Sequence, residues 1–298
     1  MPTFSLGLFG LQQWFGGDFA GVVDLVRRAD AKGVHQVSVT DHVVMGEALD
    51  TYPYGPFPTT SNFNWYEPIT TLSVLAGATS RIRFSTGIII SPLRPAALLA
   101  KQIGTLDDLS KGRLSIGVGT GWQKEEYLAC GVPWESRYDL MMEQAQAMRA
   151  LWRDAPARFD GEFIKFEKTY CRPAPVKGSV PLLFGLAPSP KNVSRMAAHG
   201  DGWVPMQQDP KKLKEGMAEI RAEMRKVGRG DAPFGLRAVP RILLKDNAPD
   251  FETSMEQIPA LIEAGATEIE VHPIAYLRGE QDWDGFLDRI VQLQETYK

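Results

Sequence analysis

The sequence predicts an α/β protein, a (β/α)8 TIM barrel formed as a single domain by residues 1–298. Eight short apolar segments alternate with eight segments of helical period, which is typical of a parallel sheet with crossover helices. Short glycine-containing turns such as Lys32-Gly33 and Lys111-Gly112 follow the helices, whereas longer segments follow the strands. The working residues are therefore expected at the carboxyl ends of the strands.

The predicted strands cover residues 5–9, 36–40, 81–90, 113–119, 181–185, 202–206, 236–244 and 268–272. The predicted helices cover residues 18–32, 68–78, 96–109, 137–152, 191–198, 211–227, 254–264 and 282–297. Single residues set several boundaries: Gly33 ends the first helix, and Ser254-x-x-Gln257 reads as a capping box for the seventh. Pro240 must interrupt the hydrogen bonding of the seventh strand.

Two segments depart from this alternation. Residues 43–66, after the second strand, are rich in Pro, Gly, Tyr and Phe and lack a helical period. They predict a long loop that forms a lid or a pocket wall, although its aromatic side chains could simply hold the loop in place. Residues 156–175 alternate aromatic and polar side chains around Asp160-Gly161, which predicts a β-hairpin insertion between the fourth helix and the fifth strand.

The composition excludes several classes of protein. A net charge of −3 and a pI near 5.9 give no basic surface for nucleic acid. No apolar run has the length of a membrane span, and the N-terminus does not read as a signal peptide. Cys130 and Cys171 are far apart and form no C-x-x-C motif, so we expect neither disulfides nor a metal site, and a cytoplasmic location.

A glycine-rich segment, Gly117-Val-Gly-Thr-Gly-Trp122, follows the fourth strand. Its G-x-G-x-G spacing differs from the G-x-G-x-x-G fingerprint of dinucleotide-binding folds, and no acidic residue follows at the required distance. Glycines at a strand end allow a flat or phosphorylated ligand to approach the backbone closely. The alternative is a turn with packing duties alone.

Histidines at two strand ends are candidates for chemistry. Asp41-His42 follow the second strand, and histidine is the side chain whose charge changes near neutral pH, which suits a general acid or base. His42 could instead be a hydrogen-bonded structural histidine. His272 ends the eighth strand, where Pro273 could simply mark the end of that strand.

Other side chains near these positions remain open to two interpretations. Trp122 could line a substrate pocket, stack on a ring or pack against its neighbours. Glu126 and Arg137 could pair with each other or reach the tail of a cofactor.

The order of these motifs resembles the bacterial-luciferase-like superfamily of flavin and deazaflavin monooxygenases over almost the whole chain. The matching motifs are Asp41-His42, Glu67-Pro68, Ser85-Thr-Gly-Ile88, Leu106-Asp-Asp-Leu-Ser-Lys-Gly-Arg113, Gly117 to Trp122, Glu126-Tyr127, Pro181-Leu-Leu-Phe-Gly185 and Asp201-Gly-Trp203. Within the superfamily, the chain looks most like the single-chain oxidoreductases that use the deazaflavin coenzyme F420. Such enzymes move a hydride between the deazaflavin and a small organic substrate.

The resemblance implies a set of site residues. A bulge at Gly87-Ile88, often with a non-proline cis peptide bond, would lie behind the ring of the cofactor, and the turn from Gly185 to Ser189 would bind its phosphate through backbone N–H groups. The implied cofactor contacts are Thr86, Gly87, Ile88, Gly117, Gly119, Gly121, Trp122, Gly185, Leu186, Ala187 and Ser189. The implied catalytic residues are His42 and Asp41, and the implied substrate pocket contains Trp65, Tyr66 and His272.

Two departures from the family pattern refine this prediction. Leu186 stands where a second glycine is usual in the phosphate turn. Trp122 and Gly46 stand where the deazaflavin-dependent sugar-phosphate dehydrogenases have glutamate and tryptophan, so we expect a small apolar or aromatic substrate instead. The resemblance also implies a homodimer.

Two other functions stay open. One is an FMN-dependent, two-component monooxygenase that uses O2 and receives reduced flavin from a separate cofactor-reducing enzyme. The other is a barrel that binds a flavin or a fatty-acid-like ligand without turnover.

Overall fold

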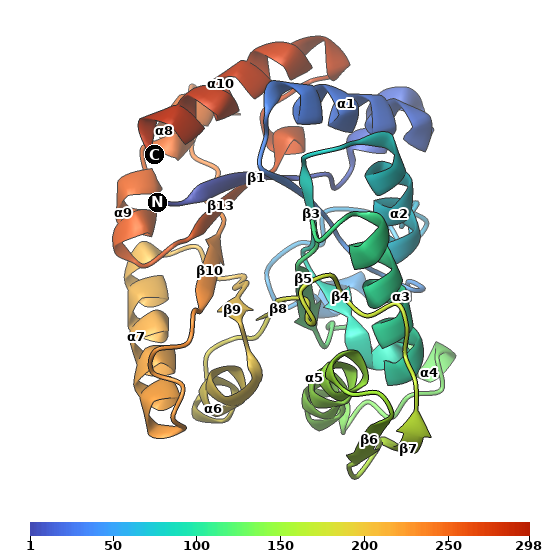
Figure 1. The fold of residues 1–298 in the computed structure, drawn as a ribbon. Coiled ribbons are helices and arrows are strands. Elements are labelled where there is room, and N and C mark those ends of the chain that lie inside the picture. The colour runs from blue at the N-terminus through green and yellow to red at the C-terminus, as the bar shows by residue number, and fades with distance from the viewer.

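A ring of parallel strands, covered on its outside by helices, organises the protein (Figure 1). The computed structural model describes all residues from 1 to 298. Nine strand segments follow one another in the order β3-β2-β1-β13-β10-β9-β8-β5-β4. The two ends of this order, β3 (Arg83–Thr86) and β4 (Ile89–Ile90), are the halves of one interrupted strand, so the ring closes. The predicted (β/α)8 barrel is confirmed.

The element bounds follow the predicted alternation. The other barrel strands are β1 (Thr3–Gly7), β2 (Gln36–Val39), β5 (Ile116–Gly119), β8 (Leu182–Phe184), β9 (Gly202–Trp203), β10 (Gly235–Ala238) and β13 (Glu268–Val271). The α-helices are α1 (Phe19–Lys32), α2 (Pro68–Ala78), α3 (Ala96–Leu109), α4 (Lys124–Ala129), α5 (Arg137–Arg153), α6 (Pro190–His199), α7 (Pro210–Lys226), α8 (Phe251–Met255), α9 (Ile258–Glu263) and α10 (Trp283–Thr296). Short 3₁₀ helices span Leu11–Phe15, Leu49–Thr51, Ser91–Leu93, Pro273–Ala275 and Glu280–Asp282. No helix has both the length and the apolar character needed to cross a bilayer.

The first helix illustrates why these residues form this fold. The Asp18 side chain accepts a hydrogen bond from the N–H of Ala20 and so caps the amino end of α1. Gly33 ends the helix in the left-handed conformation, at φ 86°. The apolar residues at helical spacing between these two ends face the barrel and are fully buried, namely Val22, Leu25, Val26 and Ala29.

The predicted hairpin insertion is also confirmed. β6 (Ala157–Asp160) and β7 (Lys165–Thr169) pair antiparallel beside α5, at the outer edge of the barrel (Figure 1).

Several predicted strand boundaries were wrong, among them those of the first and seventh strands. The first strand covers Thr3–Gly7 and not residues 5–9. The seventh strand ends at Ala238, because the chain then passes through Pro240, which has no N–H to donate. Residues up to 244 do not extend it: Leu244–Lys245 form β11, which pairs with β12 (Ala248–Pro249) in a separate exposed hairpin.

The predicted capping box at Ser254 and Gln257 was wrong as well. The helical region begins earlier, at α8, where Asp250 accepts a hydrogen bond from the N–H of Thr253. Ser254 lies inside that helix and donates its hydroxyl to the carbonyl of Asp250, while Gln257 makes no side-chain cap. An aspartate directly before an apolar helix was the stronger capping signal.

The inside of the barrel is polar, although the layer between strands and helices contains an apolar core of 60 buried residues. Arg237 on β10 is fully buried, and its Nε lies 2.9 Å from an Oε1 oxygen of Glu268 on β13. The same carboxylate accepts hydrogen bonds from Ser5 on β1 and Gln36 on β2. Barrel interiors of this fold are usually filled by branched apolar side chains, so this charged interior calls for an explanation.

Three glycines form a recess for the side chain of Ile88, in the interruption between β3 and β4. A Cβ on Gly119 would lie 2.8 Å from Cδ1 of Ile88, and one on Gly185 would lie 2.7 Å from its Cγ2. At Gly117 an added Cβ would lie 2.3 Å from the carbonyl oxygen of Thr86. The glycines therefore make room for the interrupted strand.

Substitution of Gly117 tests this recess. Gly117→Ala is expected to lower the free energy of unfolding by about 1–3 kcal/mol, because the new methyl group meets a backbone oxygen held in the barrel. Gly77→Ala is the matched control: Gly77 lies inside α2 with open space around an added Cβ, so the change should raise stability by about 1 kcal/mol. Urea unfolding measures both values, and a Gly117→Ala protein as stable as the wild type would contradict the recess.

Candidate functional site

A histidine and a glutamate form a close pair at the carboxyl end of the barrel. His42 follows β2, and its Nδ1 lies 3.0 Å from an Oε2 oxygen of Glu126 on α4. The His42 side chain is 8% exposed and the Glu126 side chain is fully buried. The second oxygen of Glu126 accepts the backbone N–H of Val43 at 2.9 Å. Both oxygens of the carboxylate therefore fix the segment that carries His42.

This pairing decides which nitrogen of His42 is available for chemistry. A carboxylate can only accept hydrogen bonds, so Nδ1 carries the proton that faces Glu126. Nε2 is then left to accept or to release a proton at a ligand, as in other histidines oriented by a carboxylate.

Asp41 was predicted beside His42 as a partner in catalysis, but its carboxylate faces the other way. It accepts two hydrogen bonds from Arg94, of 2.7 and 3.0 Å, and one from the N–H of Ile90. Arg94 also reaches Glu67, the residue that caps α2. Asp41 thus connects the end of β2 to β4 and to α2, and Glu126 is the acidic neighbour of His42.

Aromatic side chains surround His42. The ring centroids of Trp65, Phe57 and Trp122 lie 4.5, 5.9 and 6.1 Å from that of His42. Tyr52 packs edge-on against Phe57 and Trp122, and burial raises the pKa of its phenol, which keeps it neutral. We call Tyr52, Phe57, Trp65 and Trp122 the aromatic enclosure. Three of its members come from the long loop after β2, as expected for a lid or pocket wall.

A buried glutamine attaches the start of this loop to the glycine-rich segment. The side-chain oxygen of Gln123 accepts the N–H of Gly46 at 2.8 Å, and its nitrogen donates to the carbonyl of Gly46 at 3.3 Å. Beyond Gly46, aromatic contacts provide much of what holds the loop over His42.

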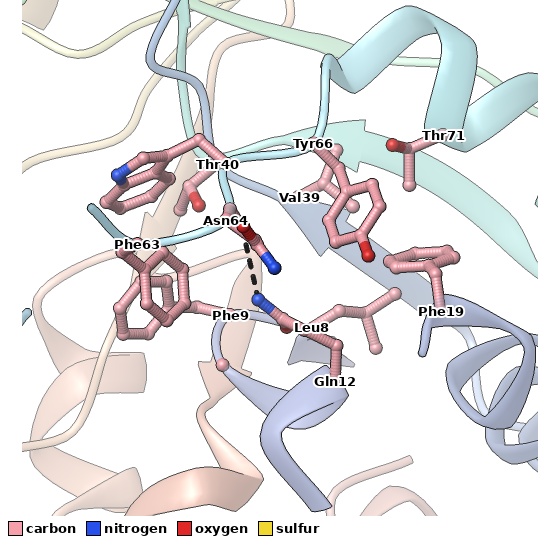
Figure 2. Close-up of a pocket in the computed structure, with 12 residues that line it drawn as sticks. Leu8, Phe9, Gln12, Phe19, Val39, Thr40, Phe63, Asn64, Tyr66 and Thr71 are labelled. Carbon is pink, nitrogen blue, oxygen red and sulfur yellow. Dashed lines mark hydrogen bonds between the residues drawn. The ribbon is translucent and has the colours of Figure 1, made fainter. Parts of the chain in front are cut away.

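Tyr66 does not join the aromatic enclosure. Its hydroxyl donates to the carbonyl of Gly17, and its ring packs against Phe19 at 4.7 Å. Figure 2 shows Tyr66 turned toward Phe19 and Thr71, in a cavity of about 30 Å³ that is also lined by Gln12 and Asn64, where Gln12 donates a hydrogen bond to the carbonyl of Asn64. Trp65 and Tyr66 both line this cavity, but of the two only Trp65 also packs against His42.

His272 forms a second histidine–carboxylate pair on β13. Its Nε2 lies 3.3 Å from an oxygen of the buried Glu270, and its ring lies flat over Gly7, where a Cβ would come within 2.4 Å of Nδ1. Burial opposes the charge on Glu270, but His272 and Arg237 outweigh it and lower the pKa of that carboxyl to about 2. The pair lies at the same end of the barrel as His42, with β1 between the two strands.

The bulge between β3 and β4 lies next to β2, the strand that His42 follows. Its peptide bond from Gly87 to Ile88 is cis, the conformation that the resemblance implies. The N–H of Gly87 donates to the carbonyl of Val39, and Gly87 faces Ser38 and Glu270, each 3.6 Å from the place of a Cβ. Thr86, directly before it, donates its hydroxyl to the carbonyl of Gly117.

The remaining predicted residues lie around the rim. Gly121 takes a left-handed conformation at φ 63°, next to Ile90. Leu186 is buried and accepts the indole N–H of Trp203, and Ser189 caps α6 by accepting the N–H of Asn192. The hydroxyl of Ser189 therefore already satisfies one of the N–H groups available at this helix start.

Sequence reasoning missed several residues of the site. Of the two possibilities left open for Glu126 and Arg137, the structure does not show the ion pair: Arg137 stacks on Trp134 at 3.6 Å, and Glu126 pairs with His42. Arg94, Gln123, Arg237 and Glu270 were not singled out. Glu126 follows the glycine-rich segment on a short helix beside the buried Tyr127, so a carboxylate on a buried helix face was the signal available.

The site offers features that suit a planar, hydrogen-bonding ring and none that suit a metal. The Nε1 donor of Trp65 is buried without a hydrogen-bond partner, and Gly87 is half-buried and lies beside the polar groups of Ser38 and Glu270. No group of three or more His, Cys, Asp or Glu side chains lies close enough to hold a metal ion.

Comparison with known proteins identifies relatives. An uncharacterised protein of Mycobacterium tuberculosis is 36% identical over 187 residues, which cover 61% of this chain and 66% of that protein, just under two thirds of its length. A 5,10-methylenetetrahydromethanopterin reductase of Methanolobus tindarius is 28% identical over 210 residues, which cover 70% of this chain and 63% of the reductase. An FMNH(2)-dependent dimethylsulfone monooxygenase of Pseudomonas putida is 25% identical over 244 residues, which cover 79% and 66% of the two chains.

Solved structures share the fold. The coenzyme F420-dependent tetrahydromethanopterin reductase of Methanopyrus kandleri has a TM-score of 0.71 at 16% identity, over 96% of each chain. A long-chain alkane monooxygenase has a TM-score of 0.76 at 14% identity, over 99% of this chain and 91% of its own. At such low sequence identities, the structural similarity supports only a shared barrel fold. The family model described as luciferase-like monooxygenase, however, matches residues 4–291, from the first barrel strand into the last helix, and the chain therefore belongs to that family.

Proposed function

We propose that the protein is an oxidoreductase that uses coenzyme F420 to transfer a hydride to or from a small apolar or aromatic substrate. The observation that carries this proposal is the His42–Glu126 pair, which lies inside the aromatic enclosure at the carboxyl end of the barrel. Family membership and the reductase among the relatives support a flavin or deazaflavin as the cofactor.

Each part of the site has a task in this proposal. Bound F420 would supply the hydride acceptor or donor. Gly87, Ile88 and the buried N–H of Trp65 would contact its ring, and the turn from Gly185 to Ser189 would lie near its phosphate. The aromatic enclosure excludes water and favours an uncharged, flat substrate.

His42 would move the proton that accompanies the hydride. Its Nε2 gives a proton to a substrate oxygen when a carbonyl is reduced, or takes one when a hydroxyl is oxidised. Glu126 holds the imidazole in the required orientation. Asp41 and Arg94 hold the strand end, which makes Asp41 a positioning residue in this proposal.

An FMN-dependent monooxygenase is the second candidate. The dimethylsulfone monooxygenase among the relatives supports it, and the same enclosure could protect a reaction of reduced flavin with O2. In that case a separate enzyme must supply reduced FMN. A homodimer belongs to both proposals.

Cofactor binding separates the two candidates. Purified protein titrated with F420 and with FMN, each oxidised and reduced, should bind F420 at least about tenfold more tightly, a difference of ~1.4 kcal/mol. The change in cofactor fluorescence or absorbance on binding measures both affinities. Selective binding of reduced FMN, together with oxygen consumption, would contradict the F420 proposal and support the monooxygenase.

Replacement of His42 tests the proton transfer. His42→Gln should lower the rate at which a quinone or enone substrate reoxidises reduced F420 by about 10²–10⁴-fold, because glutamine cannot carry the proton. Binding of F420 should be retained. His199→Gln is the matched control, because His199 ends α6 away from His42 and should leave the rate unchanged. Equal rates for the wild type and His42→Gln would remove His42 from the mechanism.

A further inference from the structure

Arg237 is a buried cation for which the proposed reaction has no use. It lies on β10, which is four steps from the interrupted strand in either direction around the ring. Its side chain nevertheless crosses the barrel interior: Nη1 donates to the carbonyl oxygen of Thr86 at 3.1 Å, and Nη2 donates to the hydroxyl of Ser85. The side chain is completely buried, so it makes these bonds without water.

Two glutamates balance this charge. Nε lies 2.9 Å from an oxygen of Glu268, and Nη1 lies 3.4 Å from an oxygen of Glu270. A buried cation is tolerated only with such partners, and keeping three charged groups inside a barrel is costly when apolar side chains would fill the same space. The planar guanidinium can meet a carboxylate, a hydroxyl and a carbonyl at once, which a lysine ammonium cannot do in the same geometry.

The bond to Thr86 matters because of where that residue lies. Its carbonyl is the last one of β3, directly before the Gly87–Ile88 bulge. The other parts of the bulge are already held: the N–H of Gly87 by Val39, and the side chain of Ile88 by the glycine recess. After the bulge, the N–H of Ile90 is held by Asp41. The Thr86 carbonyl is held from inside the barrel, and Arg237 provides that contact.

We infer that Arg237 is a positioning residue, which holds the Thr86 carbonyl across the barrel and thereby fixes the bulge against which the cofactor ring rests. The second half of this inference rests on the proposed function. Glu268 and Glu270 lie beside the guanidinium as its acidic partners, and Glu270 also connects it to His272 at the mouth of the barrel. A purely structural arginine would stabilise the barrel as a whole without a particular effect on the bulge.

Two variants remove the contact in different ways. Arg237→Lys keeps the charge but loses the planar group that joins Thr86, Ser85 and Glu268. The double variant Arg237→Gln/Glu270→Gln leaves the net charge of Arg237, Glu268 and Glu270 unchanged. It replaces the Arg237→Lys variant in the experiment if that variant does not fold. Glu270→Gln alone keeps both bonds from Arg237 to β3. Arg221→Met is the remote control, because Arg221 also donates to two backbone carbonyls, those of Ala232 and Phe234.

Amide hydrogen exchange of a peptide covering residues 84–91 reports on the bulge with no cofactor present. Loss of a charged hydrogen bond should speed exchange in that peptide at least about tenfold in both Arg237 variants, and much less in Glu270→Gln or Arg221→Met. The dissociation constant for F420 should rise at least about tenfold in the same two variants. Arg221→Met should lower the Tm without either effect.

The outcomes are distinguishable. Unchanged exchange at residues 84–91 in folded Arg237 variants would overturn the positioning role. Faster exchange there with an unchanged dissociation constant for F420 would overturn the link to the cofactor. If the wild type binds neither F420 nor FMN, the proposed function fails. Faster exchange in the Arg237 variants that is confined to residues 84–91 would even then support the positioning of the bulge by Arg237.

Discussion

The interruption of the third barrel strand at Gly87 and Ile88 is the constraint on which the arrangement of the barrel mouth depends. It divides one strand into β3, which pairs with β2, and β4, which pairs with β5, and the N–H of Gly87 donates to Val39 on β2. The side chain of Ile88 packs against glycines on β5 and after β8. The N–H of Ile90 donates a hydrogen bond to Asp41, which follows β2. The carboxylate of Asp41 already accepts hydrogen bonds from Ile90 and Arg94, so the imidazole of His42 pairs with a different carboxylate.

That carboxylate is Glu126, and its burial explains how the rest of the mouth is assembled. One oxygen orients His42 and the other holds the backbone of Val43, so the start of the long loop is fixed at the base of the barrel mouth. The loop then returns over His42 through Phe57 and Trp65, while Trp122 closes the opposite side. His42 is thus a nearly buried histidine that is oriented by a carboxylate and flanked by half-buried aromatic rings.

The sequence was sufficient for the parts of the structure that depend on local patterns. The alternation of strands and helices and the hairpin around Asp160 were predicted from residue order, whereas the bulge at Gly87 was implied by the resemblance to the luciferase-like superfamily. The partners of side chains were harder, because they depend on contacts between distant strand ends. Asp41 and Glu126 are 85 positions apart in numbering, and nothing in either motif indicates which of them faces His42. Arg237 lies in a strand that looks ordinary in sequence, and its role is visible only once β10 and β3 face each other.

A crystal structure of the protein with oxidised F420 would test the central claim most directly. The account predicts that the deazaflavin ring lies against Gly87 and Ile88, accepts the indole N–H of Trp65 and leaves space for a substrate between itself and Nε2 of His42. A ring bound elsewhere on the barrel, or a mouth still filled by Phe57 and Trp122, would contradict the account.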